Sequence, residues 1–158
     1  MREILFRGKR VDNGEWVEGQ TIVVIHQDDN DLIFMPQHGE DVKADPMEGN
    51  DRALTSIYGN YYQILPQTVE QYTGLTDKNG RKIFEGDILK IVHKYQSPFD
   101  DDTKEYTDIT TDVVFFDDEG LCFSYGESPF LCVADNVTAE YEVVGNIHDN
   151  PELLEVTE

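Results

Sequence analysis

The sequence predicts a mainly β protein, and three observations lead to this class. Apolar and polar residues alternate over short runs, as they do in strands whose side chains point to opposite faces of a sheet. Asn-Gly pairs at 13–14 and 79–80 provide tight-turn chemistry between such runs. No window longer than about ten residues keeps the i, i+3, i+4, i+7 apolar spacing of a helix. The length of 158 residues suits one domain, with two lobes as the alternative.

Residues 1–65 form the first predicted region, an N-terminal β region that contains a hairpin. The turn Asp12-Asn13-Gly14 and a polar loop at 27–31 separate short runs with strand character. Residues 36–56 lose all periodicity and place two prolines and two glycines among charges, so we expect an irregular excursion there. The predicted strands are 4–7, 16–17, 21–25 and 32–35, and packed structure is expected to resume at 58–65.

Residues 66–158 form the second predicted region. A tight turn at 77–80 and a bend at Gly86-Asp87 lead into a strand that ends near residue 92. The acidic segment 96–111 has little to bury, and we expect a mobile loop there. The pair Asn150-Pro151 is typical of a helix start, which predicts one helical turn at its C-terminal side. The other predicted strands are 69–72, 113–116, 121–123 and 140–145.

The chain is strongly acidic, with 33 Asp and Glu against 12 Lys and Arg and a net charge of −21. Residues 1–10 carry +3 and residues 70–94 carry +1, so −25 falls on the rest of the chain. Such a surface repels DNA, because DNA binding depends on cations that replace condensed counterions. We therefore expect no direct contact with nucleic acid. The acidic surface either keeps the protein soluble or attracts a basic partner.

The sequence also predicts the compartment. No apolar run approaches the roughly 18 to 20 residues of a membrane span. Charges at Glu3 and Arg7 leave no room for the apolar core of a signal peptide. Cys122 and Cys132 give no disulfide framework, which suits a reducing compartment. We expect a cytoplasmic protein without membrane contact.

The sequence contains no local signature of a catalyst or cofactor site. The nucleophile motif Gly-x-Ser-x-Gly, the zinc motif His-Glu-x-x-His and the phosphate-binding glycine loop are all absent. The two cysteines match no common zinc spacing, and the four histidines are isolated from one another in sequence. We therefore predict no catalytic residue, no metal ligand and no cofactor. A metal-dependent enzyme with dispersed carboxylates remains the alternative.

One segment, residues 71–89, stands out by its glycines, Gly74, Gly80 and Gly86, which are spaced six residues apart. Each fits a point where a strand turns, and Asn79-Gly80 fits a reversal that needs a positive φ. The acids of this segment allow two interpretations. They hold backbone N–H groups of the turns, or they form a binding site. The candidate binding residues are Asp77, Glu85 and Asp87.

The same segment carries a family resemblance. It reads Tyr-Thr-Gly-Leu at 72–75, Asp-Lys-Asn-Gly at 77–80 and Ile-Phe-Glu-Gly-Asp-Ile at 83–88. In these blocks the chain resembles the YopX family of bacteriophage and prophage proteins. The start at 1–7 and the end at 143–154 are similar to the family as well, whereas 26–58 and 95–110 depart from it.

The resemblance implies a mainly β protein with an SH3-like, partly open barrel in residues 66–158 and no established activity. On this basis we expect a phage or prophage accessory protein of the bacterial host cytoplasm that acts through a protein partner or through self-association. Two alternatives are an acidic mimic of DNA that inhibits a basic host protein, and an enzyme that uses carboxylates and a metal ion. A structural component of the phage particle is a further class.

Overall fold

The computed structural model describes most of the chain and divides it into two compact units. Unit 1 is Met1–Gln71 and unit 2 is Tyr72–Glu158. The predicted mainly β class is confirmed, because strands and two short 3-10 turns make up the regular structure of the described residues. These residues are 3–27, 30–36, 61–96, 105–117, 122–125 and 139–154.

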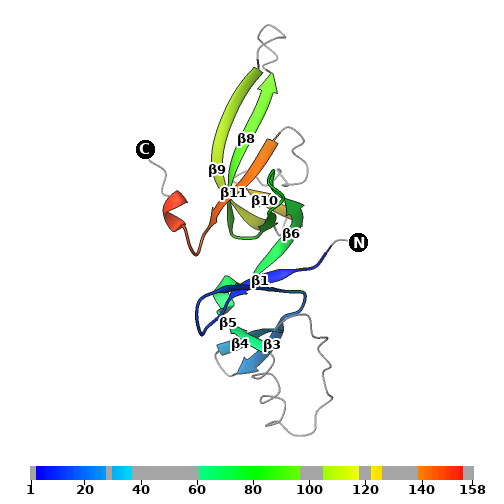
Figure 1. Cartoon of the computed structure of the whole chain (residues 1–158), viewed down its shortest axis with the longest axis vertical. Coiled ribbons are helices and arrows are strands. Elements are labelled where there is room, and N and C mark those ends of the chain that lie inside the picture. The colour runs from blue at the N-terminus through cyan, green and yellow to red at the C-terminus, as the bar shows by residue number, and fades with distance from the viewer. Residues whose placement is uncertain are drawn as a thin grey trace. The chain divides into compact units, whose positions relative to one another are not determined.

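Unit 1 consists of short antiparallel strands (Figure 1). Strand β1 pairs with β2 on one side and with the first two residues of β6 (Glu70–Thr76) on the other. Strand β4 lies between β3 and β5. The bounds are β1 Phe6–Lys9, β2 Trp16–Gly19, β3 Val23–Gln27, β4 Asn30–Pro36, β5 Tyr61–Ile64 and the 3-10 turn η1 Pro66–Thr68.

The core of unit 1 forms where strands approach closely. Phe34, Met35 and Ile64 are almost completely buried. Gly8 lies directly against Ile64, since a Cβ atom on Gly8 would stand only 2.3 Å from the Ile64 Cγ2 atom. Glycine is therefore the residue that this contact between the strands requires.

Unit 2 contains a long hairpin, β8 with β9, flanked by β10 and β11 in the order β10-β9-β8-β11 (Figure 1). The hairpin of β6 and β7 packs against this sheet through Ile83 and Leu75. The bounds are β6 Glu70–Thr76, β7 Lys82–Phe84, β8 Asp87–Gln96, β9 Glu105–Asp117, β10 Cys122–Tyr125, β11 Ala139–Asn146 and the 3-10 turn η2 Pro151–Leu154.

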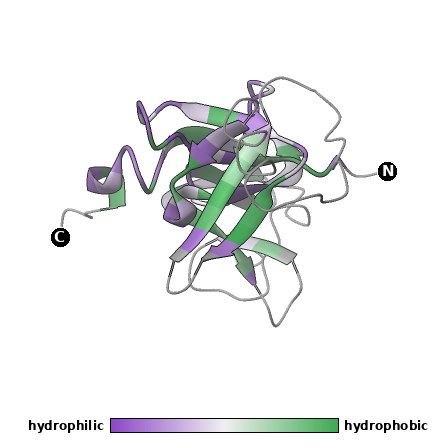
Figure 2. Ribbon diagram, turned by 90° about the horizontal axis from the view of Figure 1, so that it is seen from below, coloured by the Kyte–Doolittle hydropathy of each residue, from purple (hydrophilic) through white to green (hydrophobic). Residues whose placement is uncertain are grey.

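The core of unit 2 draws one or two side chains from each of several strands. Figure 2 colours some strands of the chain as hydrophobic over much of their length and others as mainly hydrophilic. Burial of these side chains removes apolar surface from water and stabilises the fold by about 25 cal/mol for each Å². The buried cluster consists of Ile83, Leu89, Ile91, Val114, Phe123, Tyr125 and Val143.

Two expectations for the chain require correction. The first strand is 6–9 rather than 4–7, because its register with β2 runs from Phe6 to Lys9. The loop predicted over 96–111 is wrong for Gln96, which ends β8, and for 105–111, which belong to β9 and pair residue by residue with β8. Ladder hydrogen bonds from β8 hold these polar residues extended, and threonine suits a strand. Residues 97–104 lie outside the described part of the chain.

Other expectations fall partly or wholly outside the described residues. Apart from Pro36, which ends β4, the excursion at 36–56 is not described. The described strands form open sheets, and none of them closes into a barrel. Within the same residues no helix is long and apolar enough to cross a membrane.

Candidate functional site

The carboxylate of Asp77 holds three backbone N–H groups. Its Oδ1 atom accepts hydrogen bonds from the Asn79 amide at 2.8 Å and the Arg81 amide at 2.9 Å, which closes the turn. Its Oδ2 atom accepts the Val143 amide of β11 at 3.1 Å. Gly80 has the positive φ predicted for this reversal, 81°. Asp77 therefore ties the turn to a strand that lies 66 residues further along the chain.

Hydrogen bonding also sets the acidity of Asp77. Burial by itself raises the pKa of this carboxyl group, but the bonds from Val143, Arg81 and Asn79 together lower it below the ordinary 3.8. A carboxyl group whose pKa falls on folding stabilises the fold above its unfolded pKa, and this stability is lost as the pH falls through the folded pKa.

This sign gives a pH prediction. The difference in unfolding free energy between the wild type and Asp77→Ala is expected to be constant above about pH 5 and to shrink at lower pH. Urea denaturation of both proteins at several pH values between 7 and 2 measures the difference. A difference that stays the same down to pH 2 would contradict the ionised state of Asp77 in the fold.

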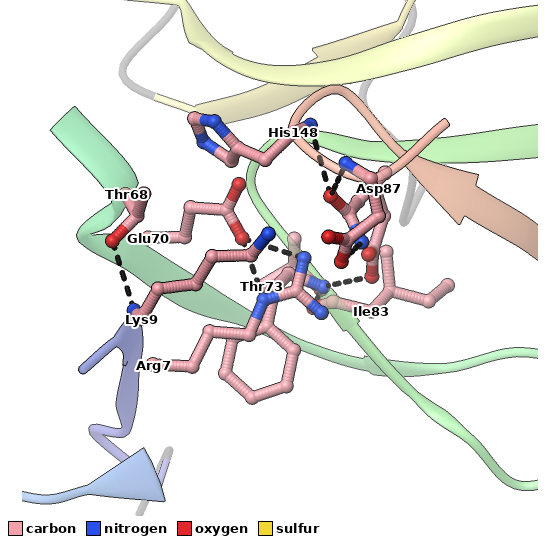
Figure 3. A network of polar contacts seen from close by, with 11 residues as sticks. Arg7, Lys9, Thr68, Glu70, Thr73, Ile83, Asp87 and His148 are labelled. Atoms are coloured by element: carbon pink, nitrogen blue, oxygen red, sulfur yellow. Dashed lines mark hydrogen bonds and ion pairs between the residues drawn. The ribbon is translucent and has the colours of Figure 1, made fainter. Parts of the chain in front are cut away.

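Asp87 is completely buried and closes the bend before β8. Its Oδ2 atom accepts the Phe84 amide at 2.8 Å. Nearby, the Thr73 hydroxyl donates to the Ile83 carbonyl oxygen at 2.8 Å and binds β6 to β7 (Figure 3). Gly86 sits in the bend with a φ of 74°. The acid and the glycine thus shape the entry to the longest hairpin of unit 2.

Glu85 differs from the other two acids. Its side chain is half-exposed, and within the described part of the chain it makes no hydrogen bond or ion pair. The three candidate residues therefore do not converge on one point. Asp77 and Asp87 hold backbone amides, whereas Glu85 holds none within the described residues.

This contrast predicts the effect of a substitution at Glu85. Glu85→Gln is expected to change the free energy of unfolding by less than about 0.5 kcal/mol, because a partly exposed side chain without partners contributes little to stability. Urea denaturation at neutral pH measures the change. A loss above about 1 kcal/mol would mean that Glu85 has a structural role like that of its neighbours.

Three aromatic rings meet on one face of the unit 2 sheet. The Tyr125 ring lies 5.7 Å from the Tyr141 ring, nearly edge to face, and 6.4 Å from the His93 ring. Burial raises the pKa of the Tyr141 phenol, and the neighbouring Tyr125 raises it further. A phenol with a raised pKa is protonated at neutral pH and is a poor base there. Tyr125 belongs to the buried core of unit 2 and Tyr141 packs against this core, so the cluster helps to hold the sheet together.

Unit 1 contains a second polar cluster. The Arg7 guanidinium forms a buried ion pair with Glu70, 2.5 Å apart (Figure 3). Arg7 and Lys9 both lie over the Trp16 ring, 4.7 Å and 5.4 Å from its centroid. Such contacts stabilise a hairpin, because the ring face is electron-rich. The N-terminal cations thus serve to join β1 to β2 and β6.

The remaining candidates for metal binding are scattered. Among the described residues, no group of three or more His, Cys, Asp or Glu side chains is placed to hold an ion. His26 contacts Asp31 at 2.7 Å on the surface of unit 1, and His93 lies beside Tyr125. His38 and Cys132 lie outside the described ranges.

Comparison with known proteins identifies the family. The sequence model of the family described as YopX protein matches residues 5–155. The chain belongs to the YopX family. Its structure is similar to the crystal structure of protein EF1440 from Enterococcus faecalis, with a TM-score of 0.48 and 24% identity over 96% of this chain and 98% of that chain. A search of curated proteins found no match.

The YopX resemblance inferred from the glycine-spaced segment is therefore confirmed. Sequence reasoning selected Asp77, Glu85 and Asp87 as one group, whereas the structure separates them by burial and by partner. It missed the aromatic cluster, whose only sequence signal is the alternation of residues in three distant strands. Only the strand register brings such residues together.

Proposed function

We propose that this YopX-family chain is a phage or prophage accessory protein that acts by protein contact in the bacterial cytoplasm and not by catalysis. The observation that carries the proposal is that the acids Asp77 and Asp87 of the family segment, the signature acids, bind backbone amides. Asp77 accepts three backbone amides, and Asp87 accepts the Phe84 amide while completely buried. A carboxylate whose oxygens hold the backbone is poorly placed to bind a metal or move a proton.

The proposal also includes the barrel and the two regions that we expect from the family resemblance. We propose that residues 66–158 form the SH3-like, partly open barrel region and residues 1–65 a separate N-terminal region. The packing of the β6–β7 hairpin on the β10-β9-β8-β11 sheet supports the first part, because two layers then share one core. Such a scaffold presents loops and strand edges to partners.

A melting-temperature series with added ions tests the proposal against the enzyme alternative. Mg²⁺, Mn²⁺, Ca²⁺ and Zn²⁺ are expected to shift the melting temperature equally in the wild type and in Glu85→Gln. An ion bound by the native state raises the melting temperature by mass action. A rise that one ion produces in the wild type and that Glu85→Gln abolishes would overturn the non-enzymatic assignment.

Capture from a lysogenic host tests the contact itself. The tagged chain is expected to retain a specific host or phage protein that an unrelated protein of equal net charge does not retain. If both baits retained the same protein, the contact would depend on charge alone, and this result would contradict the proposal.

The net charge of −21 favours a second candidate, a mimic of DNA that occupies a basic host protein. In this case the captured proteins bind nucleic acids, and their retention falls steeply between low and moderate salt, because ionic contacts are screened. Retention that does not depend on salt would exclude the mimic and leave the first candidate.

A further inference from the structure

The edge strands of the molecule differ in how their unpaired backbone groups are covered. An edge strand exposes unpaired N–H and C=O groups, and proteins cover such edges or place charges on them. Residues 9–11 cover the free side of β5: the Val11 amide donates to the Gln63 carbonyl at 2.9 Å, and the Leu65 amide donates to the Lys9 carbonyl at 2.8 Å. The chain thus closes this edge with its own backbone.

The edge of β11 is covered by the turn at residues 77–80, which we call the signature turn. The Lys78 amide donates to the Tyr141 carbonyl at 2.9 Å, and the Asp77 carboxylate accepts the Val143 amide. The turn therefore takes the place of a neighbouring strand along the middle of β11. The part of β9 beyond its pairing with β10 is protected differently, since it carries Asp108 and Asp112.

Among the residues that the structure describes, strand β3 has neither protection. Among the described strands it pairs with β4 alone, through five residue pairs from Val23 to Gln27, so its other side has no described strand partner. Residues 19–27 contain no Asp, Glu, Lys, Arg or proline. Val24 is 41% exposed. A neutral, regular and partly apolar edge of this kind is a template for another strand.

We propose that β3 pairs antiparallel with β3 of a second copy of this chain and forms a two-fold symmetric dimer. Charge selects this occupant. Two chains of −21 repel each other wherever their acids meet, and the uncharged run at 19–27 is a place where two copies can meet without placing acid against acid. An antiparallel strand pair is also self-complementary, as a two-fold contact requires. A basic partner would instead be attracted to the acidic surface elsewhere.

The proposed dimer deepens the proposed function. It rests on that function, because both assign the chain a role in protein contact. Five residue pairs make a small interface, so we expect a reversible dimer that forms in the micromolar range or above. Added salt should strengthen it, because salt screens the repulsion between the two acidic copies. A contact driven by opposite charges would weaken under the same change.

Light scattering after size exclusion, over a concentration series, tests the interface. The wild type is expected to approach twice the mass of one chain at high concentration, and more so at higher salt. Val24→Lys is expected to weaken the dimer by at least about tenfold, because it places a lysine from each copy within the shared strand pair. Val11→Lys is the matched control, since Val11 is 47% exposed and lies in a turn outside the strands. Equal masses for the two variants and the wild type would overturn the proposal.

Cysteine cross-linking gives an independent result, because a disulfide traps the dimer covalently even when it is weak. Val23→Cys, Val24→Cys and Ile25→Cys are made one at a time in a chain with Cys122→Ser and Cys132→Ser, with Val11→Cys as control. With oxidised glutathione, at least one β3 variant should form a disulfide-linked dimer at least about tenfold faster than the control, because facing residues of paired strands lie close enough to bridge. Equal rates at all four positions would overturn the proposal.

The outcomes also separate the two proposals. If the β3 variants behave like their controls while the chain still retains a specific host protein, the dimer is wrong and the protein-contact function stands. If Val24→Lys abolishes the dimer while an ion binds through Glu85, the dimer stands and the non-enzymatic function is wrong. Circular dichroism and urea denaturation of each variant establish that it is folded before its mass is compared.

Discussion

Asp77→Ala is expected to lower the free energy of unfolding of unit 2 by about 3–5 kcal/mol. The substitution removes an acceptor that is 7% exposed and leaves three backbone amides, those of Asn79, Arg81 and Val143, without their partner. Buried donors without acceptors lose their hydration and gain nothing in return. The loss affects both the turn and its attachment to β11.

Equilibrium urea denaturation, followed by circular dichroism, measures this loss. Asp108→Ala is a suitable control, because it removes the same carboxylate group from an exposed position of the same unit. Its expected effect is within about 0.5 kcal/mol. Asp77→Asn adds a sharper comparison, since it keeps one oxygen acceptor but offers an NH₂ group in place of the other. If Asp77→Ala proves as stable as Asp108→Ala, the structural role of the signature acid is wrong.

Gly8→Ala is expected to destabilise unit 1 by about 3 kcal/mol, because the new Cβ atom would overlap the Ile64 side chain. Ile64 is 1% exposed, so neighbouring atoms surround its side chain. Gly19→Ala is the matched control in the neighbouring strand. The nearest atoms to a Cβ there are 3.6 Å and 3.9 Å away, which is ordinary contact.

A second substitution tests the cause of the Gly8 effect. The overlapping atom is Cγ2 of Ile64, which leucine lacks and valine keeps. Ile64→Leu should therefore restore at least about 1 kcal/mol of the stability lost in Gly8→Ala, measured as the coupling energy of a double-mutant cycle. Ile64→Val should restore none of it. Equal coupling for the two substitutions would assign the loss to the backbone and not to the side-chain contact.

The fold class could be predicted from local signals, and long-range pairing could not. The turn at Asn79-Gly80 follows from the demand for a positive φ, and the β8 strand follows from its apolar residues. Residues 105–111 misled the prediction because polar threonines and acids resemble a loop until a neighbouring strand satisfies their backbone. Their extended state depends on β8, which no local window contains.

The candidate site was predictable in position and not in role. The glycine spacing located the segment that holds Asp77, Glu85 and Asp87, because glycine and aspartate favour the same tight bends. Burial and partners separated the three acids, and both depend on residues far away, such as Val143. Carboxylates are so common in this chain that their proximity in sequence carries little information.

The signature turn suggests a use in protein engineering. A few residues around Asp77 seal the side of β11 with one carboxylate and one amide, without the expense of building a further strand. Designed β proteins often aggregate through such sides. Grafting this short turn beside an unpaired outer strand of a designed sheet should block pairing with other molecules and keep the designed protein monomeric.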